Sequence, residues 1–198
     1  MRSRSAFLLS AAFAALAAAV AAGVFTGLDQ WSVDHLMPGG TFTSDESGLL
    51  EALVPLYGTH WGNAYSVAAN VVTLPASFVV ALAIVARRSR ALAVVLVVGT
   101  AVETLCKEVL DRPALYSGAH HITGFDSSFP SGHTLRTVLV AAAVAQPWGA
   151  AWAVASIVLL QLAGWHTPTD IAGGLLLGLL GLLGARALRR GRLLRRRA

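Results

Sequence analysis

The chain has 198 residues, of which 56% are hydrophobic and 13% are charged, and its formal net charge is +5. Soluble domains have about 25% charged residues, and the mean hydropathy here is +0.65, so we expect an integral membrane protein. The single cysteine, Cys106, excludes an intramolecular disulfide. We expect no nucleic-acid partner, because the basic residues form clusters beside apolar stretches, as the positive-inside rule describes.

The length and the apolar stretches together predict one integral membrane domain, 1–198, of the all-α class. Three stretches at 5–28, 52–86 and 137–169 contain no Asp, Glu, Lys or Arg, and each is long enough to supply at least one span of about 20 residues. We therefore expect a six-transmembrane-helix bundle with an outward-facing active site at the helix mouths. The spans are predicted at 5–27, 63–86, 91–110, 131–147, 150–165 and from 168 into a basic cytoplasmic tail, 186–198.

The first predicted span, 5–27, is rich in alanine and follows two arginines. A cleavable signal peptide has the same features, so a retained helix and a removed signal both remain open. In either case an outer segment follows at 28–61, with five acidic residues and no Lys or Arg. Its leucines predict a short interfacial helix at 46–57.

Twelve of the fifteen Lys and Arg residues lie at predicted cytoplasmic ends. The other three are Lys107, Arg112 and Arg136, and the last two flank the sequence at 130–133. Because so few cations lie away from the inner face, we infer that they hold an anion. Phosphate chemistry at a membrane surface is therefore the leading interpretation.

The sequence Pro130-Ser131-Gly132-His133 is predicted to open a helix, where backbone N–H groups without helical partners attract an anion. Gly132 would let an oxygen of the anion approach the backbone closely, and the Ser131 hydroxyl would add a hydrogen-bond donor. An anion would then lie beside His133. The simpler alternative is that Ser131 only caps the helix and that His133 has no role.

A second histidine, His166, lies four residues before Asp170, across the predicted start of the last helix. In a tight turn the carboxylate reaches one imidazole nitrogen, fixes the tautomer and leaves the other nitrogen free to attack. The alternative is that Asp170 only stabilises the helix N-terminus. Both histidines are predicted at outer helix ends, so we expect them to converge with the three cations.

Lys107 lies near the outer end of a predicted helix, four residues after Glu103, so the two side chains share a helix face and are expected to pair. An ionisable group in a membrane helix indicates function, although a lysine that only extends to the interface remains the alternative. Arg112 follows in the outer loop. Arg136 comes three residues after His133, on the same face of its helix.

The adjacent His120 and His121 lie in the same outer loop. Without spaced cysteine or carboxylate partners they are weak evidence of a metal site, so we assign no metal and no cofactor. The apolar positions identify neither a particular lipid nor an oligomeric state.

At these residues the chain resembles the type 2 phosphatidic-acid phosphatase superfamily, which also includes bacterial lipid phosphatases, glucose-6-phosphatase and the vanadium haloperoxidases. The superfamily has three motifs: Lys, six residues and Arg-Pro; Pro-Ser-Gly-His; and Ser-Arg, five residues, His, three residues and Asp. The second motif matches at 130–133, and the second half of the third matches at 166–170. The resemblance covers 107–170 by motif.

The resemblance implies a reaction without a metal. By this similarity His166 forms a phosphohistidine, Asp170 orients it, and His133 protonates the leaving alcohol. The predicted site therefore comprises His166, His133 and Asp170 as catalytic residues and Lys107, Arg112, Ser131, Gly132 and Arg136 as substrate-binding residues.

The chain departs from the superfamily at two places. Ala114-Leu115 stands where Arg-Pro is expected, because Arg112-Pro113 comes two residues early, and Leu159-Leu160 stands where Ser-Arg is expected. Each charged hydrogen bond contributes about 1.5–3 kcal/mol, so the absence of both arginines would weaken phosphate binding unless other residues compensate.

Two hypotheses concern this compensation. In the first, Arg112 and Arg136 replace the absent pair, because they are the arginines that flank the predicted site. In the second, Arg136 faces a neighbouring helix and pairs with Glu103 or Glu108.

These features predict a multi-pass protein of the cell membrane with its active site on the extracytoplasmic side. The expected function is a membrane phosphatase that hydrolyses a lipid-linked phosphate monoester or pyrophosphate through a phosphohistidine. Its expected partners are the lipid phosphate substrate and membrane lipids. The alternatives are a lipid-phosphate phosphotransferase and a degenerate, non-catalytic phospholipid-binding member of the superfamily.

Overall fold

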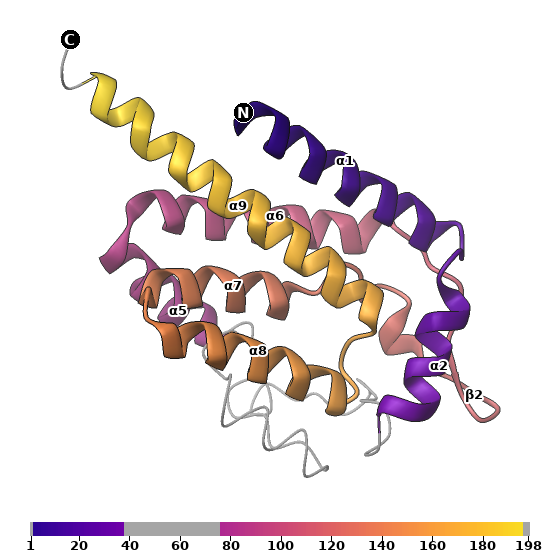
Figure 1. Cartoon of the computed structure of the whole chain (residues 1–198). Coiled ribbons are helices and arrows are strands. Elements are labelled where there is room, and N and C mark those ends of the chain that lie inside the picture. Colours follow the sequence, from indigo (N-terminus) through magenta and orange to yellow (C-terminus); the bar gives the residue numbers. More distant parts are fainter. Residues whose placement is uncertain (1, 38–75, 196–198) are drawn as a thin grey trace.

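The computed structural model describes residues 2–37 and 76–195 (Figure 1). Within these residues the chain forms helices and one small antiparallel hairpin, in which Tyr116 pairs with His121. The all-α class is therefore confirmed. The elements are the α-helices α1 (Arg2–Ala21), α2 (Thr26–Leu36), α5 (Ala76–Arg88), α6 (Arg90–Val109), α7 (Gly132–Val144), α8 (Pro147–Leu162) and α9 (Pro168–Arg195), the strands β1 (Tyr116–Ser117) and β2 (His120–His121), and the 3-10 helix η3 (Thr123–Phe125).

The prediction of a six-transmembrane-helix bundle is wrong. Among the described residues only two helical segments are long and apolar enough to cross a membrane, Arg4–Ala21 in α1 and Pro168–Arg190 in α9. The helices α7 and α8 have 13 and 16 residues, whereas a span needs about 20. The predicted helices at 131–147 and 150–165 overlap α7 and α8, so the error lies in counting these two short apolar helices as membrane spans.

The helix α6 is as long as a membrane span, but its charged residues distinguish it from the apolar segments of α1 and α9. It has 20 residues, but Glu103, Lys107 and Glu108 all lie in its second half. The predicted span at 63–86 overlaps α5, and its part at 63–75 lies outside the described residues. The described structure thus contains one long apolar helix, α9, and one helix near the N-terminus, α1, with the features of a signal or anchor helix.

The first predicted helix, 5–27, is divided in the structure. α1 ends at Ala21, the chain turns at Gly23, whose φ of +72° suits glycine, and α2 begins at Thr26. The helix α2 was not predicted, and it falls mostly in the expected outer segment. The predicted interfacial helix at 46–57 lies outside the described residues.

The helix α9 lies across the described structure, and α1, α6 and α7 all pack against it (Figure 1). Two glycines permit this: a Cβ on Gly174 would lie 2.4 Å from the carbonyl oxygen of Ser131, and one on Gly178 would lie 3.0 Å from the Val138 side chain. The absence of a side chain at both glycines thus allows α7 and α9 to approach closely. It places the first turn of α9 beside the first turn of α7.

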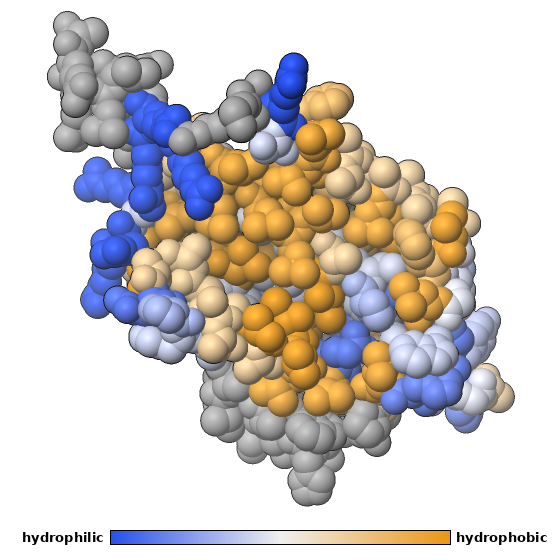
Figure 2. Space-filling model, in the orientation of Figure 1, coloured by the Kyte–Doolittle hydropathy of each residue, from blue (hydrophilic) through white to orange (hydrophobic). Residues whose placement is uncertain are grey.

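Hydrophilic residues gather toward the ends of a broad hydrophobic face (Figure 2). At one end the Nε of Arg189 donates a hydrogen bond of 3.0 Å to the hydroxyl of Ser89, which joins the basic part of α9 to the turn before α6. Asp170 lies at the opposite end of α9, about 28 Å away at 1.5 Å per residue. Large apolar side chains such as Phe7 and Val154 are exposed.

Candidate functional site

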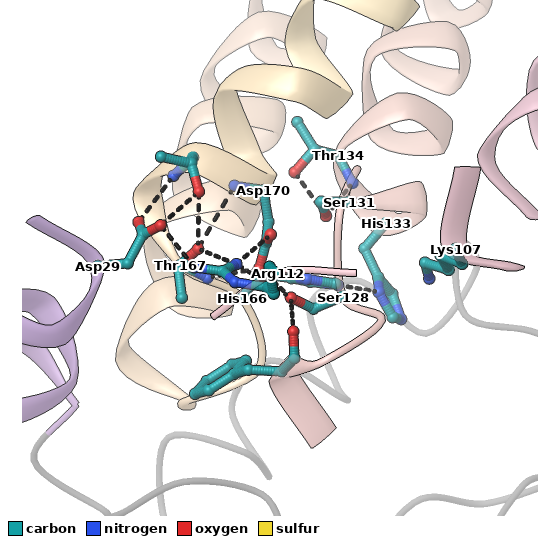
Figure 3. Close-up of polar contacts among 12 residues, drawn as sticks. Asp29, Lys107, Arg112, Ser128, Ser131, His133, Thr134, His166, Thr167 and Asp170 are labelled. Atoms are coloured by element: carbon teal, nitrogen blue, oxygen red, sulfur yellow. Dashed lines mark hydrogen bonds and ion pairs between the residues drawn. The ribbon is translucent and has the colours of Figure 1, made fainter. Parts of the chain in front are cut away.

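Two histidines meet at the end of the structure where α7 and α9 begin (Figure 3). His133 lies in the first turn of α7, and His166 lies in the connection between α8 and α9. The Nδ1 atom of His133 is 3.1 Å from the Nε2 atom of His166, which is hydrogen-bonding distance. The rings of Trp165 and His133 pack in a T shape, with centroids 5.1 Å apart. The predicted convergence of the two imidazoles is confirmed.

Asp170 lies behind His166 and is fully buried. Its Oδ2 is 3.5 Å from the Nδ1 of His166, and no hydrogen bond to this Nδ1 is formed within the described part of the chain. The same Oδ2 accepts hydrogen bonds from the Ser128 hydroxyl at 2.7 Å and the Thr167 N–H at 3.0 Å. The carboxylate is thus held in place beside His166.

Arg112, in the connection after α6, lies between two buried carboxylates. Its Nη1 donates to Asp170 at 2.9 Å, and its Nη2 donates to Asp29 at 2.6 Å. The Arg112 side chain is only 4% exposed. We call Arg112, Asp29 and Asp170 the Arg112 cluster. Because two carboxylates hold its guanidinium, Arg112 is placed to support Asp170.

Asp29 is the site residue that the sequence analysis missed. It lies in the first turn of α2 and is 1% exposed. Besides Arg112, it binds Thr169, accepting from the backbone N–H at 3.2 Å and from the hydroxyl at 2.6 Å. One signal was available, since Asp29 is the first charge after the uncharged stretch 5–28. Its partners lie 83 and 140 residues away, so local spacing does not reveal them.

A second cluster has the opposite charge pattern. Glu103 is 2% exposed, its Oε1 lies 2.8 Å from the Nζ of Lys107, and its Oε2 accepts from the Nη1 of Arg136 at 2.9 Å. We call Glu103, Lys107 and Arg136 the Glu103 cluster. The predicted pairing of Glu103 with Lys107 is confirmed. For Arg136, the structure shows the pairing with Glu103 that the second hypothesis describes.

Ser131 and Gly132 both have clear local contacts. The buried Ser131 hydroxyl caps α7 by accepting the Thr134 N–H at 3.2 Å, and the Ser131 N–H donates to the carbonyl of Asp170 at 2.9 Å. Gly132 faces Glu103, because a Cβ there would lie 2.0 Å from the Oε1 of that carboxylate. The space that the sequence assigned to a phosphate oxygen therefore adjoins a carboxylate oxygen.

Apolar residues occupy the positions where the superfamily has its other arginines. Leu160, at the arginine position of the third motif, is 1% exposed in the core. Ala114, at the arginine position of the first motif, is half-buried, and the next residue, Leu115, is 0% exposed, in a cluster with Met37 and Phe125. Among the described residues, the cations whose charges act on the histidines or on Asp170 are Lys107, Arg112 and Arg136.

His120 and His121 form the exposed strand β2. The Nε2 of His121 lies 2.8 Å from the Oδ1 of Asp126, and both side chains are exposed. Across residues 2–37 and 76–195, no group of three or more His, Cys, Asp or Glu side chains is arranged to hold a metal ion.

Burial is the main influence on the protonation of both site histidines. His166 is 5% exposed, and burial lowers its pKa below 6.5, although the nearby Asp170 carboxylate opposes this shift. The pKa of His133 is lowered further by burial and by the charges of Arg136, His166 and Lys107. Both rings are therefore neutral near pH 7, so His166 has a lone pair with which to attack an electrophile.

The arrangement unites a potential nucleophile, a proton-transfer partner and an orienting carboxylate in one place. No family model matches the sequence, and no curated protein or solved structure matches it. The functional interpretation therefore depends on the motif at 130–133, on the spacing of His166 and Asp170, and on the contacts described above.

Proposed function

We propose that the protein is a membrane phosphatase that hydrolyses a lipid-linked phosphate monoester or pyrophosphate through a phosphohistidine intermediate, without a metal. The observation that carries this proposal is the 3.1 Å contact between the Nδ1 of His133 and the Nε2 of His166, with the Asp170 carboxylate 3.5 Å behind the second ring. Together with the motif at 130–133, this geometry supports membership of the type 2 phosphatidic-acid phosphatase superfamily.

In the first step the phosphate group enters between the two rings and replaces the hydrogen bond that joins them in the empty site, and the Nε2 of His166 attacks phosphorus. The bond from phosphorus to the leaving oxygen breaks, and protonated His133 donates its proton to that oxygen. A bound phosphate dianion favours the charged form of His133, which is how a ring that is neutral in the empty site becomes the acid. The Asp170 carboxylate stabilises the positive charge that develops on His166.

In the second step water attacks the phosphohistidine. The neutral His133 accepts a proton from the water, the bond between phosphorus and nitrogen breaks, and inorganic phosphate leaves. An acceptor alcohol in place of water would make the reaction a phosphotransfer. Product analysis with added lipid and sugar alcohols distinguishes the two reactions.

We place the protein in the cell membrane as a multi-pass protein, with α1 and α9 as spans and the histidines at the extracytoplasmic surface. The part of α9 between Asp170 and Arg189 is about 28 Å long, which is close to the thickness of about 30 Å of a bilayer's hydrocarbon core. The arginines at the far end of α9 suit a cytoplasmic surface. Exposed apolar side chains such as Phe7 and Val154 suit contact with lipid.

Retention of α1 as an anchor is part of this proposal. The ring of Phe13 in α1 stacks on Phe129, with centroids 6.0 Å apart. Val20 is 5% exposed, and α1 packs along α9. Removal of α1 as a signal peptide would uncover these contacts just before the Pro-Ser-Gly-His motif.

A phosphate-release assay on the full chain in detergent tests the function. The substrate panel contains phosphatidic acid, phosphatidylglycerol phosphate and a polyprenyl pyrophosphate. We expect release from at least one lipid, a loss of about 10⁴-fold or more in His166→Ala, and no change in His121→Ala, which removes an exposed histidine. Equal release by wild type and His166→Ala would contradict the proposal.

A second candidate, a non-catalytic phospholipid-binding protein, is favoured by one observation. Arg112 and Arg136 both bind carboxylates, and the other two superfamily arginine positions are apolar. Specific lipid-phosphate binding without any phosphate release would support this candidate over the phosphatase.

A further inference from the structure

Glu103 places a carboxylate where the proposed reaction needs a phosphate. The carboxylate packs against Gly132, because a Cβ there would lie 2.0 Å from Oε1 and 2.1 Å from Oε2. One oxygen lies 2.8 Å from the Nζ of Lys107, and the other accepts from Arg136 at 2.9 Å. An anion that binds two cations beside the first residue of a helix has the surroundings that phosphate oxygens also favour.

We propose that Glu103 is a specificity-determining residue, an internal anion that occupies Lys107 and Arg136 in the empty site and yields them when phosphate binds. This inference rests on the proposed phosphatase function. Competition from Glu103 weakens the binding of every phosphate group. A lipid substrate offsets the loss through its apolar chain, whereas free inorganic phosphate does not, so the product leaves readily.

The charges around the two histidines support this role. With both rings neutral, the formal charges of the described residues in the two clusters sum to zero, so together they supply no net positive charge for a phosphate dianion. Removal of one carboxylate changes that sum to +1 and favours anion binding. The six residues are Lys107, Arg112, Arg136, Asp29, Glu103 and Asp170.

The exchange of partners is feasible because one member of the Glu103 cluster reaches solvent. The Lys107 side chain is 29% exposed, whereas that of Glu103 is 3% exposed. A partly exposed ion pair is held weakly, so Lys107 is able to leave Glu103 for a phosphate oxygen. Its charge lowers the pKa of both His133 and His166, and the same charge would attract an anion bound between the two rings.

The alternative is that Glu103 only neutralises Arg136 inside the protein. Glu103→Gln separates the two roles, because it keeps the size of the side chain and removes its charge. The full chain is purified in detergent, and the binding of inorganic phosphate is measured by calorimetry and by competitive inhibition. We expect Glu103→Gln to bind phosphate about tenfold more tightly than wild type or better, with a larger gain at pH 8 than at pH 6, because phosphate carries more negative charge at pH 8.

Glu108→Gln is the matched control, since Glu108 is an exposed carboxylate on the same helix, and its phosphate affinity should equal that of wild type. If Glu103→Gln does not fold, Glu103→Asp provides the test, because it keeps the charge near Arg136 but withdraws it from Gly132. We expect a smaller gain in the same direction.

The outcomes separate this inference from the proposed function. Equal or weaker phosphate binding by the Glu103 variants, in a protein that still hydrolyses lipid phosphates, overturns the role of Glu103 alone. If wild type and variants neither bind phosphate nor release it from any lipid, the phosphatase proposal fails, and the role of Glu103 fails with it.

Discussion

In the Arg112 cluster one cation lies between two carboxylates, whereas in the Glu103 cluster one carboxylate lies between two cations. The side chains of Arg112, Asp29 and Asp170 are 4%, 1% and 0% exposed, but Lys107 is 29% exposed. The histidine pair lies between Arg112 and Lys107 (Figure 3).

The difference indicates that two similar sets of ion pairs serve different purposes. The Arg112 cluster is buried and has a net charge of −1, which suits the positioning of a side chain. It contains Asp170, the carboxylate that faces His166. A cluster with a net charge of +1 and a partly exposed lysine suits anion binding. Arg112 and Arg136 therefore do not simply replace the absent arginines of the superfamily. Arg112 binds two carboxylates, and Arg136 shares the Glu103 carboxylate with Lys107.

The variant His133→Ala changes the ring nearer the Glu103 cluster, and we expect it to give the largest difference in kcat loss between two substrates. Loss of the general acid should lower kcat for a lipid phosphate by about 10³-fold. The loss should be much smaller for p-nitrophenyl phosphate, whose leaving group needs no proton. His120→Ala, which removes an exposed histidine in β2, is the control. Equal losses for both substrates would show that His133 does not act as the acid.

Asp29→Asn removes one negative charge from the Arg112 cluster, at a residue that does not contact the substrate in the proposed reaction. We expect kcat to fall about 10- to 100-fold, as for groups that orient a reacting residue, with little change in KM. Asp34→Asn, an exposed position on the same helix, should leave both values unchanged. A raised KM at constant kcat would instead assign phosphate binding to the Arg112 cluster.

The fold should become less stable at acid pH because of His133 and His166, the two histidines between the clusters. Burial lowers the pKa of His133 and His166 below 6.5 in the folded protein, whereas unfolded histidines titrate near pH 6.5. Below that pH the unfolded chain binds protons that the folded site does not, so the free energy of unfolding decreases as pH falls from about 7 to 5.

The measurement is Tm across that range. His133→Gln, which removes one of the two groups, should flatten the decline. A Tm that rises as the pH falls from 7 to 5, or an equal slope in the variant, would contradict this account.

The smallest effect concerns the helices that bring Asp29 to the Arg112 cluster. Phe13→Ala removes the stack on Phe129, which is worth about 1 kcal/mol and should lower Tm by about 2–4 °C. Phe7→Ala, at a position 72% exposed, should lower it by less. Intact-mass measurement of the purified protein shows directly whether α1 is present, and its loss would exclude a role for Phe13.

Much of the site was predictable because its signals are local. Pro130-Ser131-Gly132-His133 opens a helix, His166 and Asp170 straddle the next helix start, and Lys107 follows Glu103 by one helical turn. Each pattern spans a few residues, so local backbone geometry determines its contacts.

The remaining features depend on distant contacts. Nothing near Arg112 indicates that Asp29 will bind it across 83 residues, and the sequence allowed Arg136 either to replace a lost arginine or to pair with Glu103. The predicted number of membrane spans was wrong for a different reason. The sequence located α7 and α8 as two separate helices, but hydropathy does not distinguish a short apolar helix that packs against its neighbours from a helix that crosses a membrane.

The central claim is that His166 carries phosphate during the reaction, and trapping of that intermediate tests it most directly. The purified protein is mixed with radiolabelled lipid phosphate, quenched in alkali, where phosphohistidine survives, and mapped by mass spectrometry. The account predicts an acid-labile phosphate on His166 that is absent in His166→Ala. Rapid phosphate release by wild type with no label on His166 at any quench time would contradict it.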